Sequence, residues 1–232
     1  MTANDRLRTF TFAGKFRGMA DELAKAITHV IYPVLKPEGF QRIRRREFIR
    51  DGEGIVQRLG FQVNSWGGRD FCVNVSVNLI ASNEFVTLQP GFRLSNDTNG
   101  SDLWLPSRTS EEARASVELV LGFIEKQALP FFERSRTIEG FSDLLAEEKW
   151  ASSHHLQFQQ GVAAAIQGRA DDAERHLNEA KRLYEADGRE WCFKKIDQAT
   201  QLLEAVAAGN ATQVLSQWTH DNAKAHGIDH VR

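Results

Sequence analysis

The chain has 232 residues, of which 41% are hydrophobic and 26% charged, and its formal net charge is −2. This composition is typical of a globular protein and excludes a largely disordered one. It also argues against nucleic-acid or membrane-surface binding as the main function, because such binding needs a strongly basic surface. No apolar run approaches the roughly 18 residues of a membrane span, and Cys72 and Cys192 form no disulfide framework. We therefore expect a cytoplasmic protein.

The first predicted element is an amphipathic helix. Apolar residues recur at three- and four-residue spacing from Met19 to Leu35. Pro33 is expected to kink or end this helix, because proline lacks the backbone donor. The hydrophobic period then changes to two, which predicts an antiparallel meander with one apolar and one polar face. Its strands are expected at 40–50, 55–66 and 71–79, with a short fourth strand near 92–94.

Helices are expected again after the meander. Thr109 and Glu112 form a capping-box pattern that predicts a helix start, and Pro130 is expected to end that helix. A further helix is predicted over 138–149. The predicted fold class is α+β: an antiparallel β-meander of three to four strands packed against helices, in a domain over residues 1–150.

From about residue 152 the pattern is helical throughout. Residues 154–186 resemble one tetratricopeptide-type hairpin, and a second, poorer match covers 191–225. A single repeat cannot bury a solenoid core alone, so residues 151–232 are expected to dock on the α+β body or to mediate self-association. The small and bulky residues that the repeat needs for close packing are at Gly161, Gly168, Ala173, Leu177 and Ala180.

Four short motifs mark the first half of the chain. They are Pro33-Val34-Leu35-Lys36 with Gly39-Phe40, Arg46-x-Phe48-x-Arg50, Phe61-Gln62-x-x-x-Trp66, and Phe71-x-Val73-Asn74-Val75. Together they resemble a bacterial family known as "domain of unknown function 4304", over roughly residues 20–150. The resemblance implies an α+β fold. It brings no established activity, so it supplies no catalytic residues.

The polar face of the meander is the most suggestive surface. Alternate residues of neighbouring strands share a face, and amides, an aromatic ring and arginines can hydrogen-bond to or stack on a ligand. The alternative is a one-sided sheet that simply exposes its polar face to water. The candidates are Gln62, Asn64, Trp66, Asn74 and Asn78, joined by Arg42, Arg44 and Arg46 if the first strand has no bulge.

Three other groups could carry chemistry, and each has a simpler explanation. The arginines of 42–46 could contact phosphates, but neighbouring carboxylates cancel much of their charge. His226 and His230 have the spacing of a helical metal site, but Gly227 interrupts the helix between them. Cys72 has no identifiable histidine partner for a nucleophilic role. We expect neither a metal nor a cofactor.

These patterns favour a non-enzymatic binding protein. It would present its polar sheet face and its C-terminal helices to a protein partner or to a second copy of itself. One alternative is a small enzyme or nucleotide-binding module that uses the polar face as its pocket, and another is weak RNA binding through residues 42–46. A deep pocket beside Gln62 and Asn74 would favour an enzyme, and a shallow face would argue against it.

Overall fold

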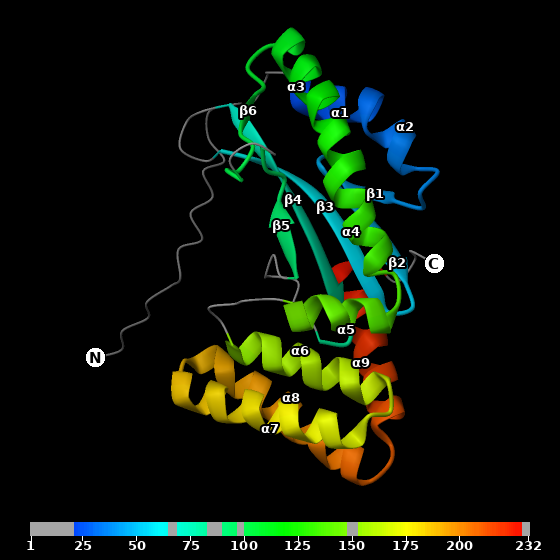
Figure 1. Cartoon of the computed structure of the whole chain (residues 1–232), viewed down its shortest axis with the longest axis vertical. Coiled ribbons are helices and arrows are strands. Elements are labelled where there is room, and N and C mark those ends of the chain that lie inside the picture. Colours follow the sequence, from blue (N-terminus) through cyan, green and yellow to red (C-terminus); the bar gives the residue numbers. More distant parts are fainter. Residues whose placement is uncertain (1–20, 65–68, 83–89, 97–99, 148–152, 229–232) are drawn as a thin grey trace, which may run out of the picture.

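The computed structural model describes residues 21–64, 69–82, 90–96, 100–147 and 153–228. It contains one antiparallel sheet with helices against it, followed by an all-helical segment (Figure 1), which confirms the predicted α+β class. The strands are β1 (Gln41–Arg44), β2 (Glu47–Gly52), β3 (Ile55–Val63), β4 (Asp70–Leu79), β5 (Gly91–Arg93) and β6 (Leu105–Pro106). The helices are α1 (Glu22–Val30), α2 (Tyr32–Leu35), α3 (Ser110–Phe123), the π-helical turn η1 (Ile124–Ala128), α4 (Leu129–Arg134), α5 (Ile138–Glu147), α6 (Ser153–Ile166), α7 (Ala170–Asp187), α8 (Glu190–Ala207) and α9 (Ala211–His226).

The sheet has the order β1-β2-β3-β4-β5, and β6 also pairs with β4. The single strand predicted over 40–50 is wrong, because this segment is a hairpin of β1 and β2 with Arg44 opposite Glu47. The chain reverses at Arg45 and Arg46, where the sequence contains none of the Gly, Pro, Asn or Asp residues that usually mark a turn. The short strand predicted near 92–94 is confirmed as β5, shifted by one residue.

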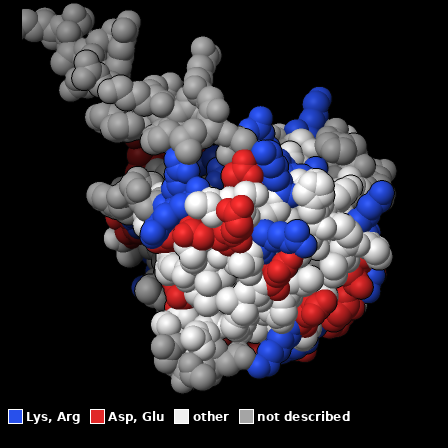
Figure 2. All heavy atoms as spheres, turned by 90° about the horizontal axis from the view of Figure 1, so that it is seen from above, with Lys and Arg blue, Asp and Glu red and all other residues white. Residues whose placement is uncertain are grey.

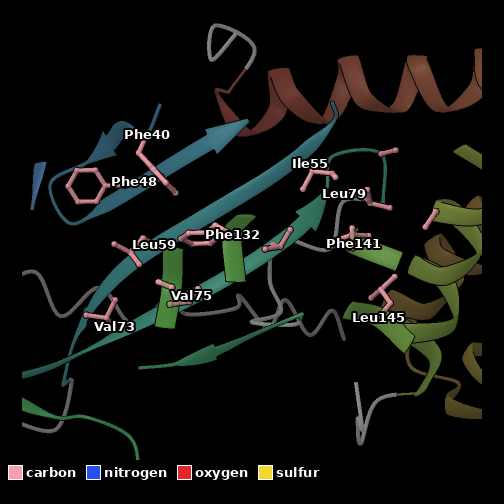
Figure 3. Packing of buried hydrophobic residues seen from close by; sticks show 14 of the residues in the cluster. Phe40, Phe48, Ile55, Leu59, Val73, Val75, Leu79, Phe132, Phe141 and Leu145 are labelled. Carbon is pink, nitrogen blue, oxygen red and sulfur yellow. The ribbon is translucent and has the colours of Figure 1, made fainter. Parts of the chain in front are cut away.

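The apolar face of the sheet forms the main core. Phe48 lies opposite Leu59, and Leu59 lies opposite Val75, so the three side chains share one face. Figure 3 shows Phe132 of α4 lying among these residues. The ring centroids of Phe132 and Phe40 are 5.2 Å apart. Helices α1, α3 and α4 therefore cover the face that the alternation of apolar residues predicted to be buried.

Helix continues beyond Pro130, so the predicted end there is wrong. In the π-helical turn η1, the Leu129 N–H donates to the Ile124 carbonyl, five residues earlier. This wider turn places Pro130 in the first turn of α4, where its missing N–H breaks no regular helical hydrogen bond. The helix then reaches Arg134 and brings Phe132 into the core.

The turn between β2 and β3 places a residue other than glycine in a left-handed conformation. Glu53 has φ 55° and Gly54 has φ 79°, the pattern of a type I′ hairpin turn, which favours Asn-Gly. Replacing Glu53 by asparagine is therefore expected to raise the free energy of unfolding by about 0.5–1 kcal/mol. Urea denaturation of both proteins checks this result. Equal or lower stability of Glu53→Asn would show that Glu53 makes compensating contacts.

The C-terminal helices continue the same core. Phe141 and Leu145 of α5 lie between the Leu79 end of β4 and the C-terminal helices (Figure 3), within one hydrophobic cluster that also contains Phe158 and Leu202. Helices α6 and α7 pack against each other, with Ala173, Leu177 and Ala180 buried on α7. The C-terminal segment thus docks on the sheet. None of the helices that the structure describes is long and apolar enough to cross a membrane.

Helix α9 leaves the helical stack and lies on the other face of the sheet, opposite α3 and α4 (Figure 1). Its Asn222 amide donates to the carbonyls of Ile80 (2.9 Å) and Ala81 (3.2 Å). Gly227 ends the helix with φ 66°, and the Ile228 N–H donates back to the Ala223 carbonyl (2.9 Å), the bond of a Schellman cap. This cap turns Ile228 into a second cluster of buried residues with Ile49, Val56 and Ile80.

Candidate functional site

Helix α9 divides the polar face of the sheet into a covered part and an open part. Asn78 lies on this face but is only 1% exposed. Its Oδ1 atom has no hydrogen-bond partner among the described residues. Asn78 is therefore unavailable to a large partner. The covering helix begins more than 130 residues further along the chain, so the strand pattern alone could not reveal it.

The open part of the face contains a hollow of about 540 Å³. It lies where the β1–β2 turn meets the middle of β3 and β4. The structure brings Arg44, Arg46, Gln62 and Asn74 together there. The strand pattern placed Gln62 and Asn74 on one face, but it placed Arg44 and Arg46 there only for a first strand without a bulge, and that strand has a register shift. The residues that line the hollow are Arg44, Arg45, Arg46, Glu47, Arg58, Gly60, Phe61, Gln62 and Asn74.

Besides Asn78, three predicted site residues are not among those lining the hollow. A register shift between Arg42 and Arg44 places Arg42 on the helix-covered face, where it donates to Thr28 Oγ1 (2.7 Å) and lies over the Phe48 ring. Asn64 lies past the end of β3, where its backbone N–H donates to the Asp70 carbonyl. Trp66 lies outside the described residues.

A row of hydrogen bonds runs across the open face towards the hollow. Arg93 Nε donates to Asn74 Oδ1 (3.1 Å), and Asn74 Nδ2 donates to Gln62 Oε1 (2.9 Å). Arg93 also pairs with Asp102 (2.9 Å), and this hydrogen bond raises the pKa of Arg93. Because Gln62 uses its carbonyl oxygen as the acceptor, its amide nitrogen is left as a donor at the hollow. Sequence reasoning missed Arg93, although its place in the predicted fourth strand could have indicated it.

The lining of the hollow carries excess positive charge. Four arginines line it together with a single carboxylate, that of Glu47. Glu47 lies between Arg58, with which it forms a close ion pair, and Arg44 (3.5 Å). Arg46 approaches Asp21 only to 4.0 Å. The Arg45 guanidinium has no ion-pair partner within the part of the chain that the structure describes. Arg45 and Arg58 were not among the predicted site residues.

This local excess contrasts with the surface seen from above in Figure 2. There, basic and acidic side chains alternate across the visible face, with no continuous basic stripe. The excess of arginine in the hollow is therefore a local feature of a chain whose formal net charge is −2. A hollow lined by guanidinium and amide donors complements a compact group of acceptor oxygens, such as a carboxylate.

The structure offers little for covalent or metal chemistry near the hollow. Cys72 lies opposite Gln62 in the sheet but is 1% exposed, and burial raises the pKa of its thiol, which disfavours the reactive thiolate. The positive charge of Arg58 acts on the His226 imidazole. Burial, and secondarily Arg58, lower the pKa of His226. Among the residues described, no group of three or more His, Cys, Asp and Glu side chains is arranged to hold a metal ion. His230 lies outside them.

The fold and this site define a class of protein: an α+β meander whose polar face is half covered by the C-terminal helix and bears an arginine-lined hollow. Residues 30–134 match the model of a family described as "Domain of unknown function (DUF4304)". This match agrees with the family resemblance that the four sequence motifs predicted. The matched segment runs from the end of α1 to the end of α4 and includes every residue that lines the hollow. Searches of curated proteins and of solved structures found no match.

Proposed function

We propose that this protein is a non-enzymatic binding module whose arginine-lined hollow holds a carboxylate-rich segment of a protein partner. The excess of arginine over carboxylate in the hollow carries this proposal. Arginine pairs with carboxylates through two parallel hydrogen bonds, which adds geometric selectivity to charge. The uncommitted guanidinium of Arg45 and the amide donors of Gln62 are the groups that would make the first contacts.

The shape and lining of the hollow favour binding over catalysis. It is a depression on an open sheet face, and its lining contains no histidine, cysteine, serine or lysine. Its one carboxylate, Glu47, is held between Arg58 and Arg44. A general base or nucleophile beside a positioned partner group is the usual requirement for covalent chemistry. The two free, buried cysteines, Cys72 and Cys192, support a reducing compartment such as the cytoplasm as the place of this binding.

A protein carboxylate is a better match to the hollow than a nucleic acid. Recognition of single-stranded RNA relies on exposed aromatic rings that stack on bases, and the one aromatic residue in the lining, Phe61, is buried. Phosphate binding along a strand also needs an extended basic track, whereas the arginines here occupy one hairpin and its neighbouring strand.

The test is the binding of a fluorescent glutamate-rich peptide, followed by anisotropy at low and physiological salt. The double variant Arg45→Ala/Arg46→Ala is expected to bind about tenfold more weakly or worse, equivalent to at least about 1.4 kcal/mol. The wild-type affinity should fall as salt rises, because the hollow is open to solvent.

Arg175→Ala is the control, since Arg175 is an exposed arginine that lies on α7, paired with Asp172. It should leave peptide affinity unchanged. Equal losses in Arg175→Ala and in the hollow variant would reject the hollow as the binding site. Tighter binding of single-stranded RNA than of the peptide would favour the nucleic-acid alternative instead.

A further inference from the structure

A second pocket lies on the same side of the sheet, where α9 meets the β2–β3 turn. Its volume is about 430 Å³, within the roughly 300–1,000 Å³ range of small-molecule sites. The residues that line the pocket come from segments far apart in the chain. None of these lining residues is a lysine or an arginine. The residues are Asp51, Glu53, Gly54, Ile80, Ala81, Ile166, Thr212, Leu215, Ser216, Thr219, His220, Ala223 and Ile228.

One wall of the pocket is apolar and held in place. Ile80 and Ile228 are buried in the second hydrophobic cluster, and Leu215 is buried in the main one. The hydrogen bonds from Asn222 fasten α9 to the end of β4, so the pocket exists without a ligand. Ile166, at the end of α6, is 41% exposed although it lines the pocket. An apolar group bound there would remove this side chain from water.

The acidic groups of the pocket are two carboxylates, Asp51 at the end of β2 and Glu53 in the β2–β3 turn. Its other polar side chains are Thr212, Ser216, Thr219 and His220. Thr219 donates its hydroxyl hydrogen to the Leu215 carbonyl (2.8 Å), so its oxygen can only accept a further hydrogen bond. The pocket therefore combines an apolar wall with carboxylates, and its lining contains neither lysine nor arginine.

We propose that this pocket binds a small organic cation with an apolar body, of the class of primary alkylammonium ions. The ammonium group would lie at the carboxylates of the β2–β3 turn, and the alkyl chain would lie against Ile80, Ile166 and Leu215. Charge complementarity selects this class over a fatty acid or a neutral alcohol of the same size. Such a ligand would contact both α9 and the sheet, and binding would stabilise the docked position of α9.

The experiment compares hexylammonium, hexanol and hexanoate as probes of the full chain, by NMR of isoleucine and leucine methyl groups. Hexylammonium is expected to bind saturably and to shift the methyl signals of Ile166 and Ile228. Glu53→Gln, which keeps a side chain of the same length in the same turn, should weaken hexylammonium binding about tenfold. It should leave hexanol binding unchanged.

A second pair of variants tests the location without altering charge. Ser216→Phe places a ring in the pocket and should abolish the shifts, whereas Gln213→Phe, on an exposed position of the same helix, should not. Hexanol binding as tightly as hexylammonium, or hexylammonium binding equally well to Glu53→Gln, would overturn the proposal. So would the absence of saturable binding. None of these three outcomes bears on the arginine-lined hollow, because that site is assayed with a different probe and different variants.

Discussion

Replacing Arg50 by alanine is expected to lower the free energy of unfolding by about 3 kcal/mol or more. The Arg50 side chain is 8% exposed and lies over the Phe40 ring. It donates to Gln57 Oε1 (2.7 Å) and the Glu38 carbonyl (2.8 Å), and forms an ion pair with Glu133 (3.0 Å). The substitution removes buried packing and leaves the Gln57 oxygen without its donor. Urea denaturation followed by circular dichroism measures the loss.

Arg136→Ala is the matched control, because Arg136 also pairs with Glu133 (3.1 Å) but is largely exposed. It should cost no more than about 0.5 kcal/mol. Arg50→Lys should be intermediate, since one ammonium group cannot reach three acceptors in different directions. A loss in Arg50→Ala no greater than in Arg136→Ala would contradict the assigned role of the buried guanidinium.

The ion pair also predicts a pH dependence. Burial would raise the pKa of Glu133, but hydrogen bonds and charge from Arg50 and Arg136 outweigh it and lower the pKa below its usual value. A carboxyl group whose pKa is lowered by folding stabilises the protein above its unfolded pKa. That stabilisation is lost as the pH falls through the lower, folded value. The difference between wild type and Arg50→Ala should therefore shrink in acid.

Replacing Gly161 by alanine is expected to destabilise the helical segment by about 1–3 kcal/mol. A Cβ atom at this position would lie 2.6 Å from Leu177 Cγ and 3.2 Å from the Leu177 backbone nitrogen. Leu177 is fully buried, so the contact between α6 and α7 would have to widen. This cost exceeds the gain of up to about 1 kcal/mol that alanine brings to a helix interior. Thermal or urea unfolding measures the net effect.

Three further variants separate steric overlap from helix propensity. Gly122→Ala in α3 has nothing within 4 Å of the added Cβ and should raise stability, by up to about 1 kcal/mol. Leu177→Ala alone creates a cavity and should cost about 2–5 kcal/mol. In the double variant Gly161→Ala/Leu177→Ala the loss should be smaller than the sum of the single losses. Simple additivity would show that the two residues do not compete for space.

The motifs that carry the family resemblance have structural roles in this chain. Gly39 has φ 85°, and the Phe40 N–H donates to the Leu35 carbonyl (3.1 Å), which closes the helical segment and brings Phe40 into the core. Phe48 and Arg50 lie on the helix-covered face, where Phe48 stacks with Tyr32 of α2 and Arg50 donates to Glu133 of α4. A family defined by such positions shares a fold, so its members can differ in what they bind.

Local sequence determined which faces are apolar and where most helices begin. The alternation of Phe71, Val73 and Val75 predicts a strand with one buried face, because side chains alternate across a strand. The hydroxyl of Thr109 predicts a helix start, because it can accept the Glu112 N–H, and it does so at 3.1 Å. These features depend on neighbours within a few residues, so they can be recognised without the fold.

Tertiary structure decided which part of the polar face remains open. The Arg45–Arg46 turn contains no turn residue, and only the pairing of β1 with β2 shows where the chain reverses. Burial of Asn78 results from α9, which reaches the sheet from the other end of the chain. The arginine-lined hollow and the α9 pocket are both made by contacts between distant segments. Such contacts depend on the packing of the whole chain, and hydrophobic periodicity carries no information about which surfaces meet.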